Sequence, residues 1–169
     1  DLIFPHHEAE IAQQESASGL KPFVKYWMHV AFLINKEEKM SKSRGNFETV
    51  HELLQKYPKE VLRFYLLSSY YRSPLELNDK ILKQSQAGIA RISELIHKLD
   101  FIKKEKDNEL STYAAKEGFD NAMDEDFNTP KALAVIFELI RQVNSDMAGN
   151  SISKNTAEKI KNFLEYANS

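Results

Sequence analysis

The segment Val30-Ala31-Phe32-Leu33-Ile34-Asn35-Lys36-Glu37-Glu38-Lys39-Met40-Ser41-Lys42-Ser43-Arg44-Gly45-Asn46 marks the point at which the chain changes character. Residues 30–34 are apolar with β-branched and aromatic members, which predicts a buried strand. The polar residues that follow end in Arg44-Gly45-Asn46 and predict a loop. From Thr49 onward apolar residues recur at helical spacing. The segment therefore joins an α/β region to a helical region.

Upstream of the expected strand, the sequence predicts one helix. Pro5 suits the first helical position, acidic residues follow it in the first turn, and Gly19 indicates the C-terminal end. One helix and one strand cannot bury a parallel sheet alone, because crossover units need partner strands on both sides. We therefore expect residues preceding Asp1 to belong to the working protein.

Downstream of the loop, the sequence predicts a series of amphipathic helices. Pro58 separates the first two, and Thr129 is expected to cap a later helix that has Pro130 at its first position. The expected later helices cover residues 78–99, 111–123, 130–147 and 154–167. The fold class is thus an α/β remnant followed by a mainly α-helical bundle.

The composition limits the class of protein and its compartment. The chain has 169 residues, of which 42% are hydrophobic and 28% charged, and its formal net charge is −2. No apolar run is long enough to span a membrane, and the first residues lack the features of a signal peptide. The absence of cysteine excludes disulfides and suits a reducing compartment, so we expect a cytoplasmic protein without membrane partners.

The motif Lys39-Met40-Ser41-Lys42-Ser43 directly follows the expected strand. Most segments of such composition are simply mobile lysine–serine loops. This five-residue word, in this context, nevertheless resembles the KMSKS signature of class I aminoacyl-tRNA synthetases. The resemblance implies that all five residues bind ATP and that Lys42 is the chief catalytic residue.

A lysine-bearing loop suits the chemistry that the resemblance implies. When an amino-acid carboxylate attacks the α-phosphate of ATP, negative charge builds up on the departing pyrophosphate. Ammonium groups that meet this charge stabilise the transition state more than the ground state. Lysine provides a compact charge on a flexible stem, and a loop can close after ATP binds.

A possible metal site lies in Phe4-Pro5-His6-His7-Glu8-Ala9-Glu10. On a helix His6 and Glu10 share a face, and imidazole and carboxylate are ordinary zinc ligands. Alone, such a pair more often forms a surface hydrogen bond. Residues 1–10, however, resemble the segment of cysteinyl-tRNA synthetases that gives a histidine and a glutamate to zinc, although Ala9 replaces the asparagine of many members.

The resemblance implies one Zn²⁺ per intact chain, held by His6, Glu10 and two cysteines from earlier in the chain. In that family the zinc binds the thiolate of substrate cysteine and so discriminates it from serine. Trp27 and Met28 are expected to pack in a core. His29 has two open interpretations, since it could pack there as well or line the adenylate pocket.

The resemblance extends into the helical region. Residues 59–67 resemble the helix that follows the catalytic core, and residues 124–133 resemble a helix start in the DALR-type domain. The implied domains are a Rossmann-like catalytic part with the KMSKS loop (1–47), a stem-contact region (48–77) and a helical DALR-type tRNA-facing domain (78–169). Asp124 to Asp126 are interpreted as charge at a helix start, because no EF-hand spacing surrounds them.

The implied function is that of a cysteine–tRNA ligase. It would activate L-cysteine with ATP and Mg²⁺ to cysteinyl-adenylate and transfer the cysteinyl group to tRNA-Cys. This chain lacks the HIGH-type motif and the zinc cysteines, so we expect it to be inactive alone. Two alternatives remain open at this point: a cysteine–amino sugar ligase of mycothiol biosynthesis, and a non-catalytic RNA- or protein-binding module derived from the synthetase.

Overall fold

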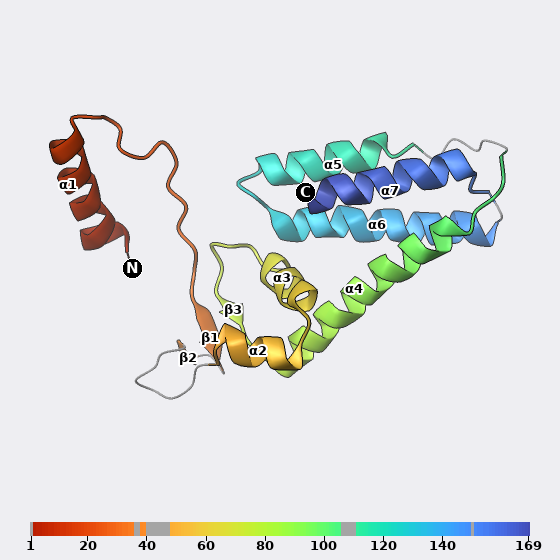
Figure 1. Cartoon of the computed structure of the whole chain (residues 1–169), viewed down its shortest axis with the longest axis horizontal. Helices are drawn as coiled ribbons and strands as arrows, with labels where there is room; N and C mark the ends of the chain where they lie inside the picture. The colour runs from red at the N-terminus through yellow and green to blue at the C-terminus, as the bar shows by residue number, and fades with distance from the viewer. Residues whose placement is uncertain (1, 36–37, 40–47, 106–110, 150) are drawn as a thin grey trace.

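A computed structural model of the chain describes residues 2–35, 38–39, 48–105, 111–149 and 151–169. Its first helix stands apart from the other helices and is joined to them by an extended segment (Figure 1). Three short strands lie beside two small helices, and four longer helices make up the remainder (Figure 1). None of the helices in this described part combines the length and apolar character that a membrane span requires.

The first helix consists of a π-helical segment, η1 (Ile3–His7), followed by α1 (Glu8–Ser18). Gly19 ends α1 with a positive φ of 69°, and its N–H donates to the carbonyl of Glu15 at 3.0 Å. Glycine adopts this left-handed conformation without the steric cost that a side chain brings. The predicted helix and its glycine end are confirmed, and none of its residues is buried.

The strands β1 (Leu33–Asn35), β2 (Glu38–Lys39) and β3 (Leu75–Glu76) form a sheet in the order β2-β1-β3. β1 is antiparallel to β2 and parallel to β3. The strand expected at residues 30–34 is thus displaced toward the loop, and its predicted burial is wrong, because Val30 is 71% exposed. The reason is that β3 reaches only Leu33 and Ile34, so it gives Val30 no apolar cover.

Three strands of two or three residues do not by themselves identify a Rossmann-like domain. That part of the predicted fold class stays a prediction. The helical part is confirmed, since every helix expected downstream of the loop is present.

The sheet, α2 (Val50–Lys56) and α3 (Lys59–Leu67) share a small apolar core. Its buried members are Leu53, Leu62, Tyr65, Leu77 and Leu82. Tyr65 donates its hydroxyl to the carbonyl of Glu76 at 2.9 Å, which fastens α3 to β3. Burial, with a smaller contribution from the Glu76 charge, raises the pKa of Tyr65 to about 12. This core fixes α2 and α3 against β3 and the start of the helix that follows it.

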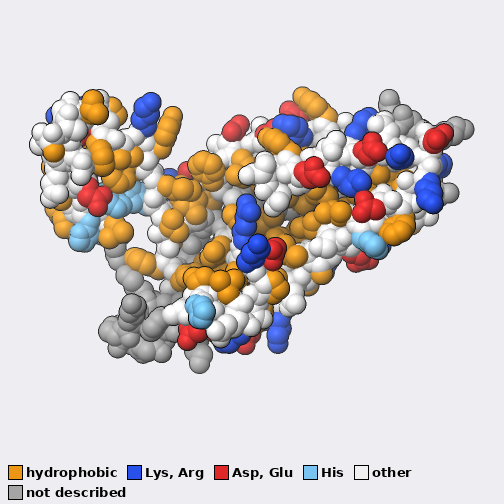
Figure 2. Space-filling model, viewed as in Figure 1, with side chains coloured by type: hydrophobic (Ala, Val, Ile, Leu, Met, Phe, Trp, Pro, Cys, Tyr) orange, Lys and Arg blue, Asp and Glu red, His pale blue; other side chains and the backbone are white. Residues whose placement is uncertain are grey.

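The larger core belongs to a bundle of α4 (Asp79–Asp100), α5 (Tyr113–Asp124), α6 (Thr129–Ala148) and α7 (Lys154–Asn168). Helix α4 gives Leu82 to the first core and Leu95 and Leu99 to the second, so it connects the two. Figure 2 shows acidic and basic side chains interspersed over the α5–α7 end of the molecule. The bundle therefore has an apolar interior and a charged surface, as its amphipathic sequence predicts.

The cap of α6 differs from the expected one. Asn128, not Thr129, caps the helix: its side chain accepts from the N–H of Lys131 at 3.2 Å, and its carbonyl accepts from Ala132. Thr129 is therefore the first helical residue and Pro130 the second. Asparagine is the better N-cap of the two, which accounts for the shift by one residue.

Candidate functional site

The predicted ATP-binding segment lies only partly within the described residues. Lys39 ends β2 and is paired with Ile34 of β1. Met40, Ser41, Lys42 and Ser43 lie outside the described residues. The structure therefore fixes where the motif begins, at the edge of the three-stranded sheet.

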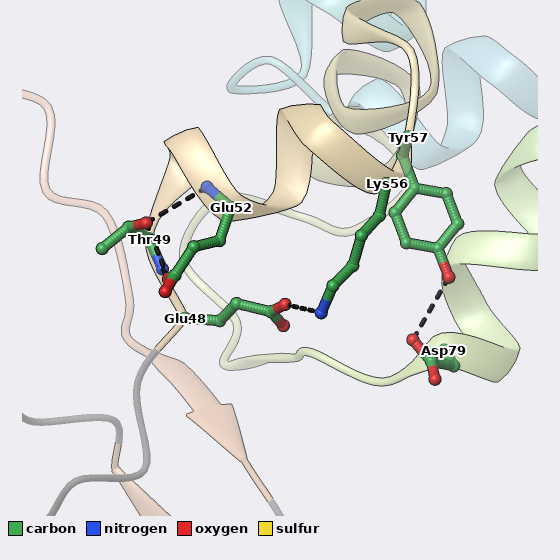
Figure 3. Close-up of polar contacts among 6 residues, drawn as sticks. All are labelled: Glu48, Thr49, Glu52, Lys56, Tyr57 and Asp79. Carbon is green, nitrogen blue, oxygen red and sulfur yellow. Dashed lines mark hydrogen bonds and ion pairs between the residues drawn. The ribbon is translucent and has the colours of Figure 1, made fainter.

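On the other side of the motif, Thr49 begins α2 with a capping box (Figure 3). The Thr49 hydroxyl oxygen accepts from the N–H of Glu52 at 3.2 Å, and the Glu52 carboxylate accepts from the N–H and the hydroxyl of Thr49, both at 2.7 Å. The hydrogen bond from the backbone N–H of Thr49, and after it the one from the Thr49 hydroxyl, lower the pKa of the Glu52 carboxyl group. The Thr-x-x-Glu pattern of residues 49–52 is the sequence signal that identifies this cap.

Two further contacts hold this side of the segment (Figure 3). Glu48 forms an ion pair with Lys56, one turn beyond Glu52 on α2, and this hydrogen bond raises the pKa of Lys56. Tyr57 donates its hydroxyl to Asp79 at 3.2 Å and so joins the end of α2 to the start of α4. Glu48 and Thr49, the first described residues after the motif, are therefore held to α2 by an ion pair and a capping box.

The predicted metal ligands lie on the first helix. His6 belongs to η1 and Glu10 to α1; both side chains are exposed, and neither has a hydrogen-bond or ion-pair partner among the described residues. Nowhere in the described part do three His, Asp or Glu side chains gather closely enough to enclose a metal ion. An exposed imidazole and carboxylate fit two positions of a zinc site, and a tetrahedral shell requires two more ligands.

The neighbouring histidine makes contacts that the sequence did not suggest. The Nδ1 atom of His7 lies 2.8 Å from Nε2 of His29, and the His7 ring stacks on Trp27 with centroids 4.9 Å apart. This cluster joins the first helix to the extended segment before β1. Trp27 is half-buried here, whereas the predicted core packing of Met28 is wrong, because its side chain is 53% exposed. The adenylate-pocket interpretation of His29 stays a prediction.

Comparison with known protein families divides the chain into two matched regions. A family model described as the catalytic domain of tRNA synthetases class I (C) matches residues 1–87. A second, described as the DALR domain, matches residues 118–169. The first region includes η1 to α3 and part of α4, and the second begins within α5.

Curated relatives agree with the family matches. The chain is 45% identical to a cysteine–tRNA ligase of Geobacter sp. (strain M21) over 95% of its own length and 35% of that protein. It is 42% identical to a cysteine–tRNA ligase of Carboxydothermus hydrogenoformans, over 99% of its own length and 36% of the relative. A cysteine–tRNA ligase of Geobacter metallireducens is 48% identical over 85% of the chain and 32% of the relative. The chain thus spans about a third of the length of the curated relatives it matches.

Proposed function

Since the chain belongs to the class I tRNA synthetase family, we propose that it acts as part of a cysteine–tRNA ligase. The enzyme activates L-cysteine with ATP and Mg²⁺ to cysteinyl-adenylate and then transfers the cysteinyl group to tRNA-Cys in the cytoplasm. Identity of 42–48% to curated cysteine–tRNA ligases supports this activity and substrate. The observation that carries the proposal is the KMSKS word itself, which begins with the last residue of β2 and is followed by the capped α2.

In this proposal Lys42 stabilises the charge that develops on pyrophosphate during adenylate formation. Lys39 is the second candidate for this contact, Ser41 and Ser43 shape the loop, and Met40 completes the ATP-binding segment. The position of the motif supports this role, since it begins at Lys39 on the sheet edge and is followed by the capped α2. Preorganised charge of this kind contributes most when its position is fixed before the reaction.

The domain assignment follows the same logic. Residues 1–47 form the last part of a Rossmann-like catalytic domain, residues 48–77 contact the tRNA stem, and residues 78–169 face the tRNA. The DALR match at residues 118–169 supports the last assignment. The charged surface of the bundle is compatible with a partner that is bound through polar contacts.

His6 and Glu10 are two of the ligands of a zinc ion, and the remaining ligands are cysteines that this chain does not contain. A bound zinc supplies a metal–sulfur bond to the substrate thiol. The exposed positions of both side chains, with no competing partner among the described residues, support this assignment. Their task is to orient the ion from one helix.

Cysteine-dependent exchange of pyrophosphate into ATP tests the proposal on the full-length protein. Exchange should occur with cysteine and fall to background with serine, because only a thiolate makes the metal–sulfur bond. The 169-residue chain alone should give no exchange. A full-length protein that catalyses no cysteine-dependent exchange would refute the proposed activity.

A further inference from the structure

Four hydrogen bonds converge on the carboxylate of Asp126, in the turn between α5 and α6. Tyr70 and Tyr71 donate their hydroxyls to it, the latter at 2.8 Å. Arg72 donates from Nε at 2.7 Å and from Nη2 at 3.3 Å, and its guanidinium lies 5.2 Å from the centroid of the Tyr71 ring. The three donors are consecutive and belong to the connection between α3 and β3, more than fifty positions away in sequence. One carboxylate thus joins the two halves of the chain, by which we mean the part up to β3 and the α5–α7 helices.

The backbone at this carboxylate is strained. Asp126 and Phe127 have φ values of 52° and 55°, in the left-handed region that residues with side chains rarely adopt. Such conformations cost about 1–3 kcal/mol each and persist only where the surroundings hold them. The turn is held by the N–H of Phe127 on the Met123 carbonyl at 2.9 Å and by the contacts of Asp126 itself. Asp126, which the sequence analysis interprets as charge at a helix start, thus accepts hydrogen bonds from three side chains of the α3–β3 connection.

The donors of Asp126 are attached in turn to the strand that leads into the ATP-binding segment. The carbonyl of Tyr71 accepts from the N–H of Ala31 at 2.8 Å, and the N–H of Leu75 donates to Phe32 at 3.1 Å. These bonds continue into the β1–β3 pairing. β1 then pairs with β2, which ends at Lys39. A continuous hydrogen-bonded path therefore runs from the α5–α6 turn to the beginning of the KMSKS motif.

A second attachment between the halves is apolar. Phe64 of α3 meets Phe137 of α6 edge to face, with ring centroids 6.0 Å apart. Helix α4 also spans both cores, with Leu82 in the first and Leu95 and Leu99 in the second, but apolar packing of this kind is not directional. The bidentate, charge-assisted contact of Arg72 with Asp126 adds a directional restraint to this packing.

We propose that Asp126 is a positioning residue, which fixes the orientation of the α5–α7 helices relative to the strand that carries the ATP-binding segment. What this orientation serves rests on the proposed function: it keeps the tRNA acceptor end in register with the adenylate. Asp126 acts through Tyr70, Tyr71 and Arg72 and touches no substrate.

Two variants of the full-length protein test the proposal, Asp126→Asn and Arg72→Gln. Each removes the charged pair from one side. The matched control is Glu125→Gln, because Glu125 is the neighbouring carboxylate and its partners, Lys131 and Asn128, belong to the same corner. Misplacement of about 1 Å far from the chemistry can cost about 100-fold. Both test variants should therefore lose about 10- to 100-fold in kcat/KM for tRNA charging. Pyrophosphate exchange should stay within about twofold of wild type in all three variants, because only transfer to tRNA depends on the bundle.

Orientation itself is measurable in the 169-residue chain, which has no native cysteine. Spin labels on Gln55→Cys in α2 and Glu117→Cys in α5 report the distance between the halves by pulsed electron resonance. The distribution should broaden in Asp126→Asn and Arg72→Gln and stay narrow in Glu125→Gln. Distributions of equal width in all variants overturn the positioning role. If the wild-type protein charges no tRNA, the proposed function fails, while the distance measurement still decides the role of Asp126.

Discussion

Gly88 lies in the interior of α4 and is buried where α3 and α6 approach that helix. A Cβ atom at this position would lie 2.9 Å from Cζ of Phe64, 3.0 Å from its Cε1 and 3.4 Å from Cζ of Phe137. Real Cβ atoms essentially never approach a neighbour to 2.9 Å, so the Phe64 ring must move in Gly88→Ala. The substitution therefore tests whether the Phe64–Phe137 contact between the halves requires a residue without a side chain at position 88.

Two opposing effects determine the size of the change. Alanine in a helix interior is about 1 kcal/mol better than glycine. Inserting a methyl group into a packed site costs about 1–3 kcal/mol. The edge-to-face contact of Phe64 with Phe137 contributes about 0.5–1.5 kcal/mol, and part of this is lost if the Phe64 ring moves. Phe64 also lines cavities of about 340 and 280 Å³, so its ring has space to move and the cost stays below the upper limit. We expect Gly88→Ala to lower the free energy of unfolding by about 1 kcal/mol.

Urea unfolding of the chain, followed by circular dichroism, measures this change. Gly118→Ala is the matched control, since Gly118 also lies inside a helix but its added Cβ would meet Val135 only at 3.4 Å, an ordinary contact. It should raise the free energy of unfolding by about 0.5–1 kcal/mol. In a Phe64→Leu background, which removes the far end of the ring, Gly88→Ala should become stabilising.

The two glycines thus have opposite predicted signs. Equal stabilisation by Gly88→Ala and Gly118→Ala would refute the close approach of Phe64 to α4. A destabilisation by Gly88→Ala that persists unchanged in the Phe64→Leu background would show that another neighbour is responsible.

Three further predictions concern the site and its support. In the full-length protein Lys42→Ala should slow adenylate formation by about 10²–10³ while zinc content stays unchanged, and pyrophosphate exchange at the wild-type rate would contradict this role. His6→Ala should remove the zinc and erode discrimination between cysteine and serine; equal zinc in both proteins by metal analysis would show that His6 is not a ligand. Tyr65→Phe should cost about 1–2 kcal/mol by leaving the Glu76 carbonyl without its donor. The folded pKa of Tyr65 is raised to about 12, so between about pH 10 and 12 only the unfolded state ionises and the stability of the wild type should fall as pH rises. This fall should be smaller in Tyr65→Phe. If urea unfolding shows the same loss of unfolding free energy between about pH 8 and pH 11 in both proteins, the prediction is wrong.

The helical half of the fold was predictable because its helices carry both an amphipathic pattern and local boundary signals. Asn78 caps α4, Pro58 separates α2 from α3, and Gly19 ends α1, each by chemistry that acts within a few residues. The cap of α6 was displaced by one residue because Asn128 and Thr129 are both capable caps. Local signals therefore locate helices well and choose poorly between adjacent candidates.

The sheet and the contacts between the halves were not predictable, because they depend on residues distant in sequence. The strand at residues 30–34 moved toward the loop since its position is set by β3, which has only two residues and no strong strand pattern of its own. The role of Asp126 depends on its contacts with Tyr70 to Arg72, and no sequence signal near Asp126 predicts these contacts. The KMSKS word could be found because its chemistry resides in a contiguous segment.

Transfer of labelled cysteine by the full-length protein tests most directly whether this chain serves a ligase that attaches cysteine to tRNA. The reaction contains ATP, Mg²⁺ and labelled cysteine, with tRNA-Cys in one arm and an amino sugar acceptor in the other. We expect label on the terminal ribose of tRNA-Cys and none on the amino sugar. Label on the amino sugar alone, or on neither acceptor, would contradict it.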